Sequence, residues 1–198
     1  MLKAVIFDLN GIFIQSPKLS DRFQKDFNIE KSLFLPKLSE IMEKVRKPNA
    51  EPAFSYWKNV LKEWKIEFTE NKFWSYWFGA EAQSEKMISF AKHLREKGIK
   101  VFILSNNFKE RADYYEQYPW MHEAIDKVYF SWQTGLVKPD VKAWQLVLSE
   151  NNLKSEDCIY FDDQQKNLNS AESLGIKSYL FTNEGELERI INTHLSLI

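Results

Sequence analysis

Five polar side chains of the sequence could do chemistry together: Asp8, Ser105, Lys138, Asp162 and Asp163. Taken singly, each has an ordinary structural explanation, such as a helix cap, a turn or a solvated lysine. If one sheet edge collects them, the carboxylates repel one another unless a cation lies among them. An oxygen-lined site with open coordination positions suits Mg²⁺, which leaves room for a substrate phosphate. A carboxylate there can attack phosphorus while the lysine and serine side chains hold the phosphoryl oxygens.

The elements that would position these residues are short apolar runs rich in strand formers. Strands are predicted at residues 4–7, 101–104, 128–130, 159–161 and 177–181. Helices are predicted between them, at residues 82–97, 109–115, 139–150 and 166–174. This alternation indicates an α/β fold with a parallel sheet covered on both faces. Ligands of such sheets bind beyond the carboxyl ends of the strands, where the polar residues stand.

Residues 16–81 interrupt the alternation, because they show helical periodicity without an apolar strand run. The prolines of this stretch are Pro17, Pro36, Pro48 and Pro52. Helices are predicted at residues 19–27, 38–46, 54–64 and 70–78. Both ends of the insertion emerge near the end of the first strand, so the bundle should cap the ligand edge. The predicted domains are a core of residues 1–15 and 82–198 and a helical cap of residues 16–81.

Four segments, taken in order, resemble motifs of the haloacid dehalogenase-like (HAD) hydrolase superfamily. They are Ala4-Val5-Ile6-Phe7-Asp8-Leu9-Asn10-Gly11, Ile103-Leu104-Ser105-Asn106-Asn107, Val137-Lys138-Pro139-Asp140 and Ile159-Tyr160-Phe161-Asp162-Asp163. The resemblance extends over nearly the whole chain, and four motifs in order are more specific than any one. It implies a Rossmann-like core with a helical-bundle cap of the C1 branch inserted after the first strand.

The resemblance also implies catalytic and metal-binding roles. Asp8 would be the nucleophile that becomes aspartyl-phosphate, and Lys138 would orient it and balance its charge. The backbone carbonyl of Asn10 and the carboxylates of Asp8 and Asp163 would hold Mg²⁺. Asp162 would help to hold the metal directly or through water.

Phosphate binding follows from the same resemblance, but two positions depart from the family's common pattern. Ser105 and the backbone amide of Asn106 would hold the phosphoryl group, together with Lys138. Asn10 stands where most phosphatases of the family have a second aspartate, which protonates the leaving alkoxide and then activates water. An amide hydrogen bonds but exchanges no proton at neutral pH. The second departure is Asn167, where an additional aspartate often supports the metal.

Three interpretations of Asn10 remain open. The substrate could have a good leaving group, as an acyl phosphate does, so that no acid is needed. A cap residue or the substrate could supply the proton, which would preserve ordinary phosphatase activity. Otherwise the chain is a catalytically impaired relative that binds phosphate or a protein partner. The family's dehalogenase branch is disfavoured, because it usually has an aromatic residue at position 10 and needs no magnesium.

The remaining candidates have ordinary structural interpretations. The aromatic segment of residues 73–78, with Trp57 and Trp64, fits either the core of a small bundle or a stacking surface over the active site. Cys158 precedes a strand and lacks a nearby histidine, which favours a core residue over a nucleophile. No Gly-x-Gly-x-x-Gly or Gly-x-x-x-x-Gly-Lys turn follows the first strand, which disfavours dinucleotide and P-loop sites.

Composition limits the possible partners and compartment. The 198 residues carry a formal net charge of -1, which gives no long-range attraction for nucleic acid or an anionic membrane. One cysteine and no long apolar run predict a cytoplasmic protein. The sequence thus predicts a Mg²⁺-dependent phosphatase that acts through Asp8 on a small phosphorylated metabolite, with the impaired binding relative as the alternative.

Overall fold

The computed structural model describes residues 2–196, so the outermost residues of the predicted core, 1 and 197–198, lie outside it. The strands are β1 (Ala4–Phe7), β2 (Ile14–Gln15), β3 (Ala82–Gln83), β4 (Lys100–Ser105), β5 (Lys127–Phe130), β6 (Cys158–Asp162) and β7 (Lys177–Leu180). The helices are α1 (Leu19–Phe27), α2 (Lys31–Val45), α3 (Ala53–Glu63), α4 (Glu70–Phe78), α5 (Glu85–Glu96), α6 (Lys109–Glu116), α7 (Trp120–Glu123), α8 (Ser131–Thr134), α9 (Lys142–Glu150), the 3₁₀ turn η1 (Ser155–Asp157), α10 (Gln165–Ser173) and α11 (Glu184–Ser196).

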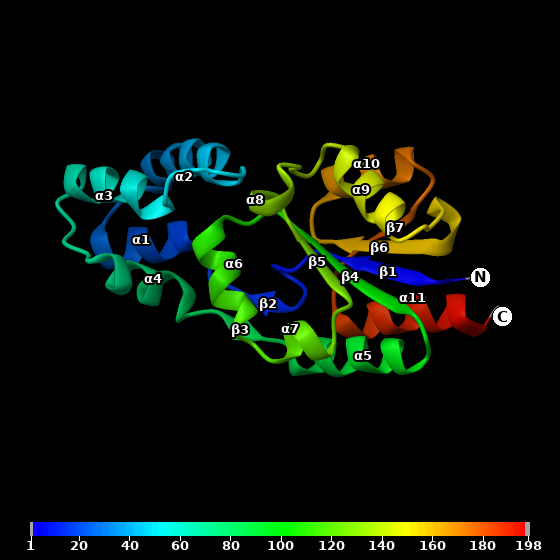
Figure 1. The fold of residues 1–198 in the computed structure, drawn as a ribbon. Coiled ribbons are helices and arrows are strands. Elements are labelled where there is room, and N and C mark those ends of the chain that lie inside the picture. The colour runs from blue at the N-terminus through cyan, green and yellow to red at the C-terminus, as the bar shows by residue number, and fades with distance from the viewer. Residues whose placement is uncertain (1, 197–198) are drawn as a thin grey trace.

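The main sheet is parallel, with the strand order β5-β4-β1-β6-β7. Strand β1 lies at its centre, where Phe7 pairs with Ile103 of β4 and with Phe161 of β6. Helices α9 and α10 cover one face of the sheet, and α5 and α11 cover the other (Figure 1). The predicted α/β, Rossmann-like fold is therefore confirmed, and the predicted strands lie within a residue or two of the observed ones.

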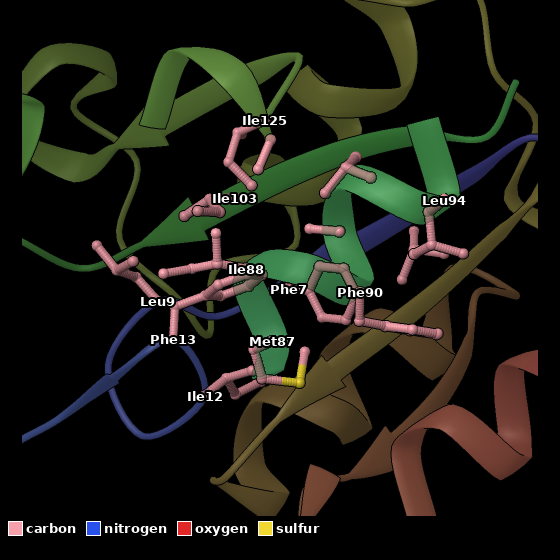
Figure 2. Close-up of a cluster of buried hydrophobic side chains, with 14 of the residues drawn as sticks. Phe7, Leu9, Ile12, Phe13, Met87, Ile88, Phe90, Leu94, Ile103 and Ile125 are labelled. Atoms are coloured by element: carbon pink, nitrogen blue, oxygen red, sulfur yellow. The ribbon is translucent and has the colours of Figure 1, made fainter. Parts of the chain in front are cut away.

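The two faces of β1 serve two cores, because successive side chains of a strand point to opposite sides. Ala4 and Ile6 belong to the cluster under α9 and α10. Phe7 belongs to the other cluster, which also contains Phe90 and Leu94 of α5 (Figure 2). All five side chains are at most 8% exposed, so β1 is anchored from both of its faces. The residue that follows β1 is held at the sheet edge for the same reason.

The inserted bundle consists of α1, α2, α3 and α4, which lie beyond the carboxyl edge of the sheet (Figure 1). The second helix differs from the prediction, because α2 begins at Lys31 rather than at residue 38 and contains Pro36. Burial explains the difference: Phe34 of the first turns is fully buried and stacks on Trp57 of α3, with ring centroids 5.7 Å apart. Pro36 itself is exposed. Packing therefore extends the helix across the proline.

Two helices of the core also begin later than predicted. Residues 82–83 form strand β3, which pairs antiparallel with β2, instead of beginning a helix. The helix α5 begins after them because the Ser84 hydroxyl accepts the backbone N–H of Met87 at 3.2 Å. The helix α9 begins at Lys142 rather than at Pro139, because the Asp140 carboxylate accepts the Lys142 N–H at 3.0 Å.

The aromatic residues of the insertion form the core of the bundle. Trp57 and Phe73 are fully buried, and their ring centroids lie 5.3 Å apart. Phe108, which belongs to the core domain, packs against Trp74 and Trp77 of α4 at 5.6 and 5.4 Å. The aromatic cluster thus also attaches the bundle to the core. No helix within residues 2–196 combines the length and apolar character needed to cross a bilayer.

Candidate active site

The carboxyl ends of two neighbouring strands bring the three predicted acids together. Asp8 directly follows β1, Asp162 is the last residue of β6, and Asp163 comes next. One carboxylate oxygen of each lies within 4.8 Å of the others. Because β1 and β6 are adjacent and in register, this clustering follows from the sheet topology.

Lys138 reaches this acidic cluster from the loop before α9. Its Nζ lies 3.0 Å from Oδ1 of Asp8 and 2.8 Å from Oδ2 of Asp162, and it donates to the hydroxyl of Tyr160 at 3.1 Å. The lysine is only 3% exposed. Its backbone is clamped by Asn106, whose Nδ2 donates to the Lys138 carbonyl and whose Oδ1 accepts the Lys138 N–H, both at 2.8 Å. The ammonium is therefore fixed between two carboxylates.

Burial and mutual repulsion set the protonation of the acids. Burial raises the pKa of Asp8 above its ordinary value and outweighs the opposing effect of Lys138, while Asp162 raises it further. Burial and the charge of Asp162 also raise the pKa of Asp163. For Asp162, burial is outweighed by Lys138 and several hydrogen bonds, which hold its pKa below the ordinary value. Two of the three carboxylates are thus poorly compensated by the protein alone.

Both oxygens of Asp162 are already engaged. Oδ1 accepts the backbone N–H of Gln164 at 2.8 Å and the amide of Asn167 at 3.0 Å. Oδ2 accepts Lys138, Tyr160 and the Asn167 amide. Asn167 is buried and supplies a donor that an aspartate in its place would lack. Asp162 therefore orients its neighbours, and neither of its oxygens is free of hydrogen bonds for a metal ion.

The rest of the cluster fits a divalent cation. Among the described residues, no group donates a hydrogen bond to Oδ2 of Asp8 or to the backbone carbonyl of Asn10. Gly11 has a φ of +94°, and a Cβ there would lie 2.8 Å from Oδ2 of Asp163. Only glycine at this position lets the Asp163 carboxylate approach the loop after β1. Two free carboxylate oxygens, a carbonyl and the residual negative charge are the donors that Mg²⁺ takes.

The loop after β4 presents hydrogen-bond donors beside Asp8. The hydroxyl of Ser105 accepts Nδ2 of Asn107 at 2.9 Å, so its own proton is available. The backbone N–H of Asn106 forms no hydrogen bond with another described backbone group. Asn107 is held in turn by its carbonyl, which accepts the Ser131 hydroxyl at 3.0 Å. These donors can bind phosphoryl oxygens without reorganising.

The side chain of Asn10 lies between two hydrogen-bond partners, one of which belongs to the loop after β4. Its Oδ1 accepts Nδ2 of Asn107 at 2.9 Å, and its Nδ2 donates to the hydroxyl of Tyr115 at 2.8 Å. Tyr115 donates its own proton to Glu81 at 2.6 Å. Glu81 also pairs with Arg111 and accepts the Ser16 hydroxyl at 2.9 Å. This network joins the site to both chain segments that lead into the bundle.

All the predicted site residues meet at this edge, namely Asp8, Asn10, Ser105, Asn106, Lys138, Asp162 and Asp163. Sequence reasoning missed Tyr160, Asn107, Tyr115 and Glu81. Tyr160 could have been found, because a residue two before Asp162 on a strand points to the same side. Asn107 belongs to a quoted motif but carried no role. Nothing in the sequence links Glu81 to Tyr115.

The fold and the acidic edge together define a Rossmann-like α/β protein with an inserted helical cap. The sequence profile of the haloacid dehalogenase-like hydrolases matches residues 5–181. The chain therefore belongs to this family, and the sequence-based recognition is confirmed.

Individual relatives are consistent with this membership. The chain is 30% identical over 93 residues to "Phosphatase MT3486" of Mycobacterium tuberculosis (strain CDC 1551 / Oshkosh), covering 46% of this chain and 43% of the relative. The chain spans less than half the length of the curated relatives it matches first.

Solved structures share the fold over nearly the whole chain. A HAD-like family hydrolase from Porphyromonas gingivalis is 24% identical, with a TM-score of 0.78 and 98% of each chain covered. The HAD family enzyme BT-2542 from Bacteroides thetaiotaomicron, solved in complex with magnesium and inorganic phosphate, is 19% identical, with a TM-score of 0.76. That match covers 92% of this chain and 95% of the other.

Proposed function

We propose that the protein is a Mg²⁺-dependent phosphatase that hydrolyses a small phosphorylated metabolite through Asp8. The observation that carries the proposal is the fixed position of Asp8, whose Oδ1 contacts Lys138 and whose Oδ2 accepts no hydrogen bond from the described residues. The phosphate and magnesium complex of a relative with the same fold supports this choice. So does the relative named a phosphatase.

In the first step, one oxygen of the Asp8 carboxylate attacks phosphorus and the bond from phosphorus to the ester oxygen breaks, which leaves the other oxygen for the cation. Lys138 fixes the orientation of the carboxylate through Oδ1. The Ser105 hydroxyl and the Asn106 N–H bind phosphoryl oxygens as negative charge spreads over them. Water then attacks the phosphorus of the aspartyl-phosphate, which releases phosphate and restores Asp8.

Asp8, Asp163 and the carbonyl of Asn10 would hold Mg²⁺, while Asp162 positions Lys138 and Asn167 around them. When bound, the metal ion neutralises the carboxylates and the phosphoryl oxygens and so permits an anion to attack an anion. The protein's own contribution is to hold the ligands at the end of a rigid sheet. Gly11 leaves the space that Asp163 needs.

The leaving oxygen has no acid at position 10 to protonate it. Asn10 is held at both ends of its amide and can only hydrogen bond. We therefore expect activated leaving groups, such as acyl phosphates and aryl phosphates, to react faster than alkyl phosphates. General acid catalysis typically contributes about 10² to 10⁴ in rate, which sets the size of this difference.

The test is phosphate release with and without Mg²⁺ from acetyl phosphate, p-nitrophenyl phosphate and a panel of sugar phosphates. Asp8→Asn should abolish release, because an amide cannot form the aspartyl-phosphate. The matched control is Asp113→Asn, which removes an exposed carboxylate that pairs with Lys109 on the surface of α6. Equal activity of the Asp8→Asn variant and the wild type would contradict the proposal.

The alternative is a relative that binds phosphate or a protein partner without turnover. The observation in its favour is the amide of Asn10, which is hydrogen-bonded at both its oxygen and its nitrogen and offers no acid at the position where most of the family's phosphatases have one. Phosphate binding that needs Mg²⁺, combined with no release from any substrate of the panel, would support this alternative.

A further inference from the structure

Arg46 stands at the C-terminal end of α2, where the bundle faces the core. It lines a groove of about 890 Å³ between the two parts of the molecule. On the side of the core, the groove is bordered by Val137 and Gln164, which are chain neighbours of Lys138 and Asp163. The groove therefore opens beside the acidic edge.

The guanidinium of Arg46 is partly buried and has no partner among the described residues. Its Nε is buried without a hydrogen bond, and the side chain forms no ion pair with any residue in the described range. Arg111, the arginine beside it, is instead neutralised by Glu81. A partly buried cation without an ion pair is poorly compensated, so an anion that enters the groove can supply the missing partner.

The surroundings of Arg46 connect it to the nucleophile. Burial lowers the pKa of Arg46 to about 10, Arg111 lowers it as well, and the carboxylate of Asp8 raises it. Both groups are therefore close enough to act on the guanidinium, which still remains charged at neutral pH. The charge balance points the same way: Mg²⁺ and Lys138 together offset the three clustered carboxylates and leave the charge of a bound phosphate uncompensated.

We propose that Arg46 is a substrate-binding residue of the cap, whose guanidinium binds an oxyanion of the substrate across the groove. The inference rests on the proposed function and extends it to the cap. The oxyanion has two possible sources, the phosphoryl group at Asp8 or a second acidic group, carboxylate or phosphate, on the leaving part. Arginine suits both, because its planar fork donates two parallel hydrogen bonds to such groups.

Calorimetric titration with two non-hydrolysable probes in the presence of Mg²⁺ tests the inference without turnover. Methylphosphonate carries one acidic group, and phosphonoacetate carries an additional carboxylate. Arg46→Gln should weaken binding of at least one probe by about tenfold to a hundredfold. Equal weakening of both identifies the phosphoryl group as the partner, whereas weakening of phosphonoacetate alone identifies the second acid. Arg46→Lys should recover part of the affinity, because it keeps the charge and loses the fork.

The matched control is Lys44→Gln, which removes a positive charge from the same helix end where Lys44 pairs with Glu40 on the surface. This variant should bind both probes as the wild type does. Unchanged affinity of Arg46→Gln for both probes, with an unchanged circular dichroism spectrum, would overturn the inference. Failure of the wild type to bind either probe would overturn it as well. The release assay with Asp8→Asn is separate, so loss of this inference would leave the proposed hydrolysis standing.

Discussion

At the scale of single residues, the direction of a chain of hydrogen bonds explains why position 10 carries an amide rather than a carboxylate. Tyr115 has one hydroxyl proton and gives it to Glu81, so the group at position 10 must donate to the tyrosine oxygen. Asparagine donates there, while an ionised aspartate would bring its carboxylate against an oxygen lone pair. The network that fixes the cap joint, where the two chain segments around Ser16 and Glu81 lead into the bundle, therefore also favours asparagine at position 10.

This chain of hydrogen bonds predicts a specific effect of the Asn10→Asp substitution. The new carboxyl group should hold a proton, since only its protonated form can donate to Tyr115, and that proton is then available to a leaving alkoxide. We expect hydrolysis of sugar phosphates to rise by about 10², while acetyl phosphate changes little. Rates across a series of leaving groups measure this, with the exposed Asn59→Asp as control. A uniform change across the series would argue against a restored acid.

Cys158 provides a second prediction at this scale. It is the single cysteine, it is 1% exposed at the start of β6, and burial raises the pKa of its thiol to about 12. The thiolate is the reactive form, so the native protein should resist iodoacetamide at about pH 8 and become alkylated in urea. Mass spectrometry counts the adducts. Rapid alkylation of the native protein would show that the start of β6 opens readily.

At the scale of elements, helix α2 contains a conflict between local preference and packing. Pro36 removes a backbone donor inside the helix, yet the turns on both sides of it bury Phe34 and Ile41. A proline in a helix interior costs up to about 3 kcal/mol relative to alanine. The packing of the bundle offsets this cost, which explains why the helix begins before the proline.

Pro36→Ala should therefore stabilise the bundle by about 1 to 3 kcal/mol, because the substitution restores the missing donor at an exposed position. Urea unfolding followed by tryptophan fluorescence measures the effect, since the bundle contains Trp57, Trp64, Trp74 and Trp77. The control is Ser39→Ala, which changes an exposed residue of the same helix. It should raise the free energy of unfolding by only a few tenths of a kcal/mol. A destabilised Pro36→Ala variant would contradict this account.

The predictability of the elements depended on their length and periodicity. The strands of the main sheet were recognisable because each is a run of strand formers ended by polar residues, as Ala4–Phe7 before Asp8 illustrates. The two-residue strands β2 and β3 are too short to show alternation, so their pairing became visible only in three dimensions. Likewise, Tyr115 and Glu81 are 34 residues apart and meet only because the cap joint folds against α6.

At the scale of the whole molecule, the protein should be stabilised by Mg²⁺ in a pH-dependent way. The pKa values of Asp8 and Asp163 are raised in the folded state, so the metal-free fold keeps protons that the unfolded chain has lost. Its stability consequently falls as pH rises from the ordinary aspartate range through the raised pKa values. Mg²⁺ replaces those protons, and its stabilising effect should grow over the same pH range.

Thermal unfolding with and without MgCl₂ at about pH 5 and about pH 7.5 measures this difference. At a metal concentration of about 100 times Kd, the expected stabilisation at the higher pH is about 2.7 kcal/mol. Asp163→Asn should lose most of it, and Asp113→Asn should keep it. Equal stabilisation at both pH values would argue against a metal site built on these carboxylates.

The insertion of the bundle between β1 and β4 also affects the order of folding. The pairing of these two strands closes a loop that contains α1, α2, α3 and α4, and loop-closure entropy rises with the logarithm of loop length. Without residues 17–80, closure of this loop would cost about 1 kcal/mol less. If the bundle folds first and β2 pairs with β3, the two ends of the insertion are already close together. Most of the extra free energy of loop closure is then removed. The antiparallel pair at the cap joint thus lets a large insertion interrupt a parallel sheet at little kinetic cost.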